Sequence, residues 1–215
     1  MKKTYLVVGL GRFGSAVAQR LYELGSEVMV IDLHPELVQK IENKVPCAAV
    51  CDARDEEALR ALGARNYDCA VVAIGSDLAT SVVATLNLKE LGVATVICKA
   101  TDDTQRRALE KIGADRVIIP ERETGIKLAQ SLTSSSILDF IELSPDCGIA
   151  EMQTPLEWCG KSIRELDIRA KYGVNVIAVR ENGKVRVTLD ANRPLDASMT
   201  LVLLGENDRL ARVTP

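Results

Sequence analysis

The chain has 215 residues and an almost balanced charge, with 27 Lys and Arg against 30 Asp and Glu and a net charge of −3. Apolar residues make up 47% and charged residues 27%, which is typical of globular proteins and excludes a disordered chain. No segment concentrates the basic residues that a nucleic-acid partner needs, and no apolar run approaches the roughly 20 residues that span a bilayer. We therefore expect one or two globular domains.

The cysteines and the N-terminus both favour a cytoplasmic protein. The first five residues lead straight into an apolar run, without the small-residue cleavage site of a signal peptide. The six cysteines form no Cys-x-x-Cys pair, and no second pair completes a zinc site with Cys47 and Cys51. We expect reduced and mostly buried thiols.

Residues 4 to 142 alternate short apolar runs with helical patterns. Continuous apolar strands separated by helices are typical of a parallel sheet covered on both faces, so we predict an α/β, doubly wound, Rossmann-like domain. Glycines follow four of the helical patterns, as left-handed helix ends require. The expected strands are 5–8, 27–31, 48–51, 69–74, 95–99 and 116–119, and the expected helices are 14–24, 35–43, 55–63, 78–91, 102–113 and 122–141.

The pattern changes after Glu142. Extended runs are expected at 148–153, 174–180, 184–188 and 200–204, and Asn182-Gly183 between two of them predicts a hairpin. We therefore divide the chain into a first domain at 1–121, an amphipathic linking helix and linker at 122–143, and a second, smaller α+β domain at 144–215.

A glycine loop is the motif that carries chemistry. Gly9-Leu10-Gly11-Arg12-Phe13-Gly14 follows the first strand, opens the next helix and precedes an acidic residue, Asp32, at the end of the second strand. In this context Gly9 permits a tight turn, Gly11 lets a phosphate approach the backbone and Gly14 lets helix and strand pack closely. The helix N-terminus then offers N–H donors to an anion. The pattern predicts a nucleotide-binding site.

Further candidate ligand contacts follow the neighbouring strands. Asp32 is placed to accept hydrogen bonds from a ribose diol, which favours an unphosphorylated 2′-hydroxyl. His34 has no partner that would make it a general base, so we interpret it as a rim residue. The carboxyl ends of the second to fourth strands complete the crevice where an adenine would lie, through Leu33, Asp52, Ala53, Ile74, Gly75 and Ser76.

Three charged residues are candidates for binding phosphates and a cation. Arg12 lies at a helix N-terminus, where a cation is unfavourable unless an anion is present, so we expect it to reach a terminal phosphate. Lys99 ends the fifth strand and is a second candidate phosphate ligand. Glu121 follows the sixth strand, where a carboxylate can meet a cation held by phosphates.

Several of these blocks together resemble the RCK (KTN) family of potassium channel and transporter regulators, and above all the KtrA/TrkA-type subunits of bacterial potassium-uptake systems. Residues 144–215 resemble the TrkA-C (RCK-C) module of that family, so the likeness covers nearly the whole chain. The blocks that carry it are Val8–Gly14, Val30–Asp32, Val72–Gly75, Leu88–Gly92, Lys111–Arg116 and Ile119–Glu121.

The resemblance implies regulation rather than enzymatic catalysis. Such subunits are cytoplasmic, form homodimers that assemble into an octameric ring, and act beneath a membrane-embedded potassium-translocating partner. ATP favours the conducting state and ADP the resting state. By residue match, Asp32 would hold the ribose, Arg12 and Lys99 the phosphates and Glu121 a cation, while 122–141 would be a helix that crosses between neighbours.

The resemblance also implies a second ligand site in the C-terminal module. Some RCK-C modules bind cyclic di-AMP between two copies, and the matching positions here are Ile163, Asp167, Arg169, Asn175 and Val176. Arg169 would contact phosphate, and Asn175 and Ile163 the base. The alternative is that Asp167 and Arg169 only organise the turn before Gly173.

Two functions from other classes remain open at this point. An NAD-dependent oxidoreductase would use Asp32 equally well, although residues 144–215 make a small substrate domain and no histidine-centred acid–base set is present. A free-standing cyclic di-AMP sensor would act through 144–215 and ignore ATP.

Overall fold

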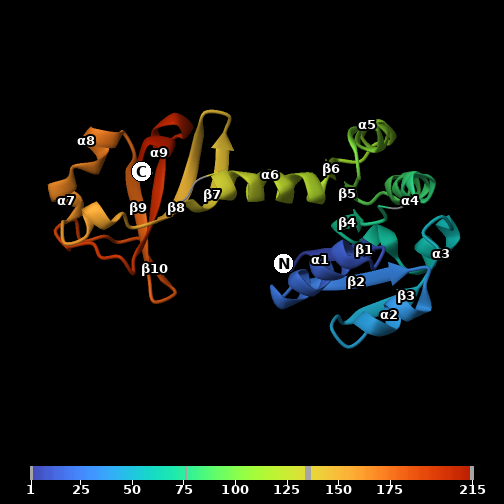
Figure 1. Cartoon of the computed structure of the whole chain (residues 1–215). Coiled ribbons are helices and arrows are strands. Elements are labelled where there is room, and N and C mark those ends of the chain that lie inside the picture. Colours follow the sequence, from blue (N-terminus) through green and yellow to red (C-terminus); the bar gives the residue numbers. More distant parts are fainter. Residues whose placement is uncertain (1, 76, 134–136, 214–215) are drawn as a thin grey trace. The chain divides into compact units, whose positions relative to one another are not determined.

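The computed structural model describes residues 2–75, 77–133 and 137–213, and the chain divides into two compact units between Arg122 and Glu123. The first unit contains a parallel sheet of six strands in the order β3-β2-β1-β4-β5-β6 (Figure 1). This order and the parallel pairing confirm the doubly wound fold. The strands are β1 (Thr4–Val8), β2 (Glu27–Asp32), β3 (Cys47–Val50), β4 (Cys69–Val72), β5 (Thr95–Lys99) and β6 (Arg116–Ile118).

Helices cover both faces of this sheet because its strands are apolar on both sides. Along β1, Val7 packs on one face with residues of α1 and α2, whereas Leu6 and Val8 pack on the other face with α3, α4 and α5. All three side chains are almost completely buried. The helices are α1 (Arg12–Glu23), α2 (Pro35–Ile41), α3 (Glu56–Ala61), α4 (Leu78–Glu90) and α5 (Asp103–Ile112), and a short 3-10 helix spans Ala64–Asn66.

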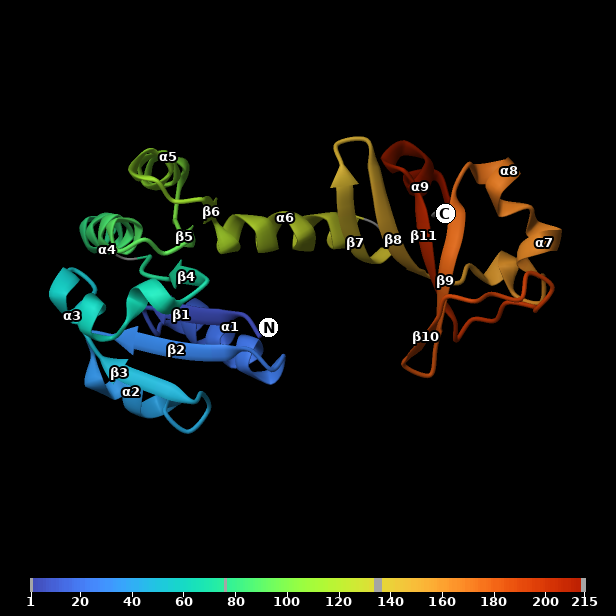
Figure 2. The same ribbon diagram turned by 180° about the vertical axis from the view of Figure 1, so that it is seen from behind.

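The second unit is an antiparallel sheet with helices packed on its core. Its five strands lie in the order β10-β9-β11-β8-β7, which Figure 2 shows from behind. The predicted hairpin is confirmed, since Asn182 and Gly183 both have positive φ between paired strands. The elements are β7 (Ile137–Ser144), β8 (Cys147–Gln153), a 3-10 helix (Leu156–Trp158), α7 (Ile163–Leu166), α8 (Ile168–Tyr172), β9 (Asn175–Glu181), β10 (Lys184–Arg186), β11 (Thr200–Glu206) and α9 (Asn207–Val213).

The predicted helix at 122–141 is wrong in its C-terminal part. The helix in this region, α6, spans Pro120–Thr133, and Ile137–Ser144 forms strand β7 instead. The apolar residues of 137–143 suit either structure, but pairing with β8 gives the backbone partners and lets Phe140 pack on the core of the second unit. The hydroxyl-rich residues 134–136 between them, also part of that prediction, lie outside the described residues.

The thiols are less buried than the sequence indicates. All six cysteines are free, but only Cys51, Cys69 and Cys98 are buried, whereas Cys147 and Cys159 are half-buried. Cys47 is exposed because it begins β3, which is an edge strand of the first sheet. Within the described parts of the chain, no helix combines the length and apolar character that crossing a membrane requires.

Candidate functional site

The carboxyl ends of β1 and β4 lie where the strand order of the first sheet changes direction. These two strands are neighbours, and the chain proceeds from them toward opposite edges of the sheet. The loops that follow them therefore diverge, and open α/β sheets bind ligands at such a point. The glycine loop follows β1 here.

The glycines of this loop have the contacts that the sequence predicts. Gly9 has a φ of +94°, and a Cβ there would lie 3.0 Å from Cγ1 of Ile74. A Cβ on Gly14 would lie 1.9 Å from the carbonyl oxygen of Gly9, so only glycine fits between the helix and the loop. A Cβ on Gly11 would meet no atom within 4 Å. Gly11 therefore faces open space, as close approach of a phosphate requires.

The N-terminus of α1 is open toward this space. Arg12 is its first residue, Gly11 is the N-cap, and no side chain caps the helix or places a carboxylate in its first turn. In contrast, Asp55, Asp77 and Asp102 cap α3, α4 and α5 with their side chains. The donor set at α1 thus fits an anionic group such as a nucleotide phosphate.

Asp32 fixes the loop from the end of β2. Its Oδ2 accepts the Leu10 N–H at 2.6 Å, and its Oδ1 accepts the His34 N–H at 2.9 Å and lies 3.0 Å from His34 Nδ1. The Asp32 side chain is 9% exposed. A carboxylate has about four acceptor positions, so Asp32 can hold the loop and still accept a hydroxyl. The His34 ring is 62% exposed, and Asp32 is a carboxylate partner that the sequence did not indicate. The place of His34 at the rim of the site stays a prediction.

The candidate phosphate and cation ligands lie together. Lys99 Nζ is 2.7 Å from Glu121 Oε1 and 5.9 Å from the centre of the Phe13 ring. A Cβ on Gly75 would lie 3.4 Å from this Nζ, so the glycine leaves room for the lysine. The hydrogen bond from Lys99 lowers the pKa of Glu121 below its usual value, and the charge of Arg12 lowers it further. Lys99 and Glu121 therefore form an ion pair next to Phe13, in the first turn of α1.

The interpretation of Glu121 as a cation ligand meets a specific constraint. In this structure the Oε1 atom of its carboxylate accepts a hydrogen bond from the Lys99 ammonium, so a metal ion would share the carboxylate with the lysine. Within the described residues, no group of three or more His, Cys, Asp or Glu side chains is arranged to hold a metal. A cation at Glu121 would therefore need phosphate oxygens as its other ligands.

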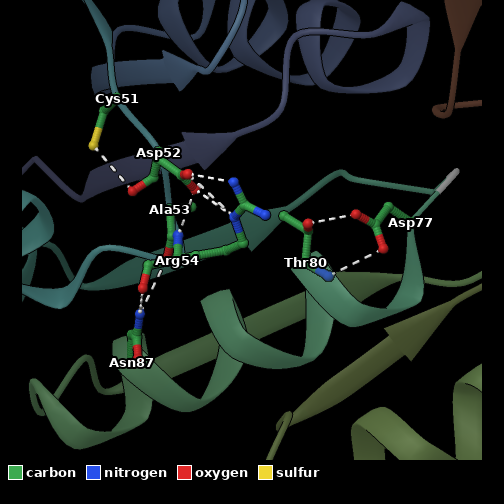
Figure 3. Close-up of polar contacts among 7 residues, drawn as sticks. All are labelled: Cys51, Asp52, Ala53, Arg54, Asp77, Thr80 and Asn87. Carbon is green, nitrogen blue, oxygen red and sulfur yellow. Dashed lines mark hydrogen bonds and ion pairs between the residues drawn. The ribbon is translucent and has the colours of Figure 1, made fainter.

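The loop after β3 is built around Asp52 and Arg54 (Figure 3). The sequence predicted a role for Asp52 but none for Arg54. Arg54 donates to the Asp52 carboxylate from its backbone N–H, from Nε and from Nη2, at 2.6 to 3.1 Å. The side chain of Asn87 on α4 donates to the carbonyl oxygens of Ala53 and Arg54. Asn87 is 7% exposed, so a buried amide holds this loop in place.

The remaining predicted contacts follow β2 and β4. Leu33 is exposed directly after Asp32, and Ala53 is buried. The Ile74 carbonyl oxygen accepts a hydrogen bond of 2.6 Å from Ser81, which ties the end of β4 to α4. Ser76 lies outside the described residues. The sequence placed these residues because they follow strands, but it carried no signal for Arg54 and Asn87, whose partners depend on tertiary contacts.

The candidate residues in the second unit lie on α7, α8 and β9. Asp167 has a φ of +45° and separates α7 from α8. Asp167, Arg169 and Asn175 are exposed. Ile163 and Val176 instead pack against the hydrophobic core of this unit. The polar members are therefore available to a ligand, while the apolar members also stabilise the fold.

Comparison with known proteins places the chain in a family. Residues 5–120 match the TrkA-N domain and residues 151–215 the TrkA-C domain. Two Bacillus subtilis proteins, Ktr system potassium uptake proteins C and A, are 37% and 35% identical, over 99% and 98% of this chain and 96% and 95% of theirs.

Solved structures share the fold. The GsuK channel matches with a TM-score of 0.72 at 20% identity, and the match covers 99% of this chain and 39% of the channel chain. The GsuK channel bound to NAD matches with a TM-score of 0.68 at 17% identity, and this match covers 98% of this chain and 38% of the channel chain. The chain therefore belongs to the RCK family of TrkA-N/TrkA-C proteins, of the KtrA/TrkA type.

Proposed function

We propose that this chain is the cytoplasmic regulatory subunit of a potassium-uptake system and that an adenine nucleotide at the glycine loop sets its state. One observation carries the proposal: the N-terminus of α1 after the glycine loop is uncapped, and the Lys99 ammonium lies 5.9 Å from the centre of the Phe13 ring in the first turn of this helix. The naming of the Bacillus relatives as potassium uptake proteins supports the transport role. The partner is a membrane-embedded potassium-translocating subunit, beneath which homodimers of this chain assemble into an octameric ring.

ATP and ADP have opposite effects in this proposal because only ATP carries the γ-phosphate. A ligand shifts a conformational equilibrium only through its different affinities for the two states. A charge-assisted hydrogen bond from Arg12 to the γ-phosphate, within one subunit or across a subunit boundary, supplies about 1.5–3 kcal/mol. Repeated around a ring, this difference reaches the roughly 5.5 kcal/mol that nearly complete conversion needs.

Calorimetric titration of the purified full chain with ATP, ADP, NADH and cyclic di-AMP tests the ligand. We expect both adenylates to bind, and Arg12→Ala to retain ADP while losing the preference between ATP and ADP. Arg20→Ala, which changes an exposed arginine at the other end of α1, is the matched control. Equal losses for both nucleotides in Arg12→Ala would contradict the switch. Binding of NADH followed by its oxidation would favour an oxidoreductase instead.

The exposed Asp167, Arg169 and Asn175 favour cyclic di-AMP as a second ligand, bound by the C-terminal module. The left-handed Asp167 precedes α8, and the left-handed Gly173 follows it, so that Arg169 and Asn175 lie on consecutive elements, α8 and β9. Arg169→Ala should abolish cyclic di-AMP binding and leave ATP binding unchanged. Retained cyclic di-AMP binding would mean that Asp167 and Arg169 only shape the turn.

A further inference from the structure

Arg54 is an exposed residue at the carboxyl edge of the first sheet. It follows Ala53 in the loop at the carboxyl end of β3, next to the end of β2 where Asp32 lies. The Cys51 N–H donates to the Asp32 carbonyl oxygen at 3.0 Å, so the ladder between the two strands continues into this loop. Together with the two hydrogen bonds from Asn87, this contact fixes the loop backbone against its neighbours.

The side chain of Arg54 in turn fixes the Asp52 carboxylate. Nη2 donates to Oδ2 at 2.6 Å, and Nε lies 3.0 and 3.1 Å from the two oxygens, so one edge of the planar guanidinium faces the carboxylate (Figure 3). The backbone N–H of Arg54 adds a fourth contact at 2.9 Å. A bidentate pair of this kind has a defined direction, which a lysine cannot reproduce.

The Arg54 guanidinium also interacts electrostatically with a second carboxylate, at the N-terminus of α4. The charges of Arg54 and Asp77, the N-cap of α4, act on each other, and Asp77 is itself fixed by hydrogen bonds from Thr80 (Figure 3). Arg54 lowers the pKa of Asp52 below its usual value, mainly through the side-chain hydrogen bond, so this residue is a carboxylate at neutral pH. The loop therefore presents an oriented acceptor.

The acceptor position of Asp52 that Arg54 leaves free indicates which kind of base this carboxylate accepts. Three N–H groups of Arg54 use most of the roughly four acceptor positions of Asp52 and leave about one free. A free carboxylate position accepts an amino group and rejects a carbonyl oxygen, because two acceptors that face each other are both left unpaired. The 6-amino group of adenine is such a donor, whereas hypoxanthine has a carbonyl oxygen at that position.

We propose that Arg54 is a positioning residue for base recognition: it orients the Asp52 carboxylate so that the crevice selects a 6-aminopurine over a 6-oxopurine. This inference rests on the proposed nucleotide function. It adds a role for a side chain that contacts Asp52 and lies apart from the glycine loop.

Competing titrations of the full chain with ATP and ITP test the proposal. Wild type should bind ATP roughly tenfold or more tightly than ITP, which is the discrimination one charge-assisted hydrogen bond supplies. Arg54→Ala should bring this ratio close to one by weakening ATP, while the affinity for ITP changes by less than about twofold. Arg54→Lys should restore only part of the ratio, because an ammonium cannot make the bidentate contact.

Two further variants separate a base-specific role from a general one. Arg60→Ala removes a similarly exposed ion pair, with Glu56, on the following helix and should leave the ratio unchanged. In the Asp52→Asn background, Arg54→Ala should have no additional effect on the ratio, since Arg54 acts through that carboxylate. Equal losses for ATP and ITP in Arg54→Ala, or tighter ATP binding, would overturn the inference. If wild type binds neither nucleotide, the proposed function fails instead.

Discussion

At the scale of single residues, the hydrogen bond between Lys99 and Glu121 means that Glu121 and a nucleotide phosphate compete for the Lys99 ammonium. The lysine side chain is 14% exposed and is held at 2.7 Å from Glu121, while the nucleotide phosphates are proposed to use this cation. A bound phosphate therefore shares the charge of this ammonium with Glu121. The free energy of such a partly exposed pair is small, about 0.2–1 kcal/mol.

Glu121→Gln should consequently raise the affinity for ATP about two- to fivefold in buffer containing EDTA, as measured by calorimetry. Glu123→Gln makes the same change of charge two residues further along and should give less than half of this effect. With excess Mg²⁺ the comparison also tests the cation role of Glu121. If Glu121 binds a metal together with the phosphates, the variant should then bind ATP more weakly than wild type. Unchanged affinity in both buffers would contradict the competition.

The sequence predicted where the candidate residues lie in the fold better than it predicted which side chains they contact. Asp32, Lys99 and Glu121 could be placed because each follows a strand, and the carboxyl ends of parallel strands lie at one edge of a sheet. It gave no means to foresee that Lys99 bonds Glu121 or that Arg54 bonds Asp52. Side-chain pairs of this kind depend on rotamers and on loops whose geometry is set by distant contacts, such as those of Asn87.

At the scale of elements, two glycines in the turn from β1 into α1 have different roles: one is needed for folding and the other for ligand binding. Gly14 is enclosed, since a Cβ there would lie 1.9 Å from the Gly9 carbonyl oxygen, whereas a Cβ on Gly11 would face open space. The backbone of Gly11, with φ of −64° and ψ of −176°, is accessible to any residue.

Gly14→Ala should therefore destabilise the first unit by about 1–3 kcal/mol or more, because the added methyl group forces helix and loop apart. Gly11→Ala should change the free energy of unfolding by less than about 1 kcal/mol and yet weaken ATP binding at least roughly tenfold by blocking phosphate approach. Urea unfolding and calorimetry on both variants measure these quantities. Normal ATP affinity in Gly11→Ala would place the phosphates elsewhere.

Asp115 joins β5 and α4 just before β6 and predicts a dependence of stability on pH. Its carboxylate accepts the Val96 N–H at 2.6 Å and the Lys89 ammonium at 2.9 Å. The bond from the Val96 N–H lowers the pKa of this carboxyl below its usual value, and Lys89 lowers it further. A folded-state pKa below that of the unfolded chain stabilises the protein above the unfolded value, and this stabilisation disappears as the pH falls through the folded value.

Wild type should therefore exceed Asp115→Asn in free energy of unfolding at pH 7, and the difference should shrink as the pH falls below about 4, the ordinary range of an aspartate. Urea unfolding of both proteins from pH 6 to pH 3 measures the difference, in which the carboxylates common to both proteins cancel. A difference that stays constant across this range would contradict the role of the charge.

Helices and strands were predictable from the sequence where the apolar residues of a segment followed only one spacing, either that of a strand or that of a helix. The six parallel strands and the hairpin at Asn182-Gly183 were predicted to within a few residues, because β-branched runs and turn residues agreed. The segment 137–141 was assigned to a helix because its apolar residues fit the spacing of a helix as well as that of a strand. Only the ladder with β8, which lies beyond the next turn, decides in favour of a strand.

At the scale of the whole molecule, each unit has its own hydrophobic core. Buried residues of the first sheet, from all its strands except the edge strand β3, form the clusters of the first unit together with its helices. Trp158, Leu201 and Leu203 belong to a separate cluster in the second unit. A ligand that binds only the folded form of one unit stabilises that unit by mass action. The two proposed ligands can therefore be assigned to units without locating either by crystallography.

Differential scanning calorimetry of the full chain should show that ATP and cyclic di-AMP shift different parts of the unfolding profile. ATP at about 100 times its Kd stabilises the first unit by about 2.7 kcal/mol, which raises its Tm by roughly 10 °C for a unit of this size. At the same ATP concentration Gly11→Ala should lose about half of this shift or more, and Arg169→Ala should lose only the shift caused by cyclic di-AMP. If one ligand raises the unfolding temperatures of both units equally, in Gly11→Ala as well as in Arg169→Ala, the assignment of one ligand to each unit is wrong.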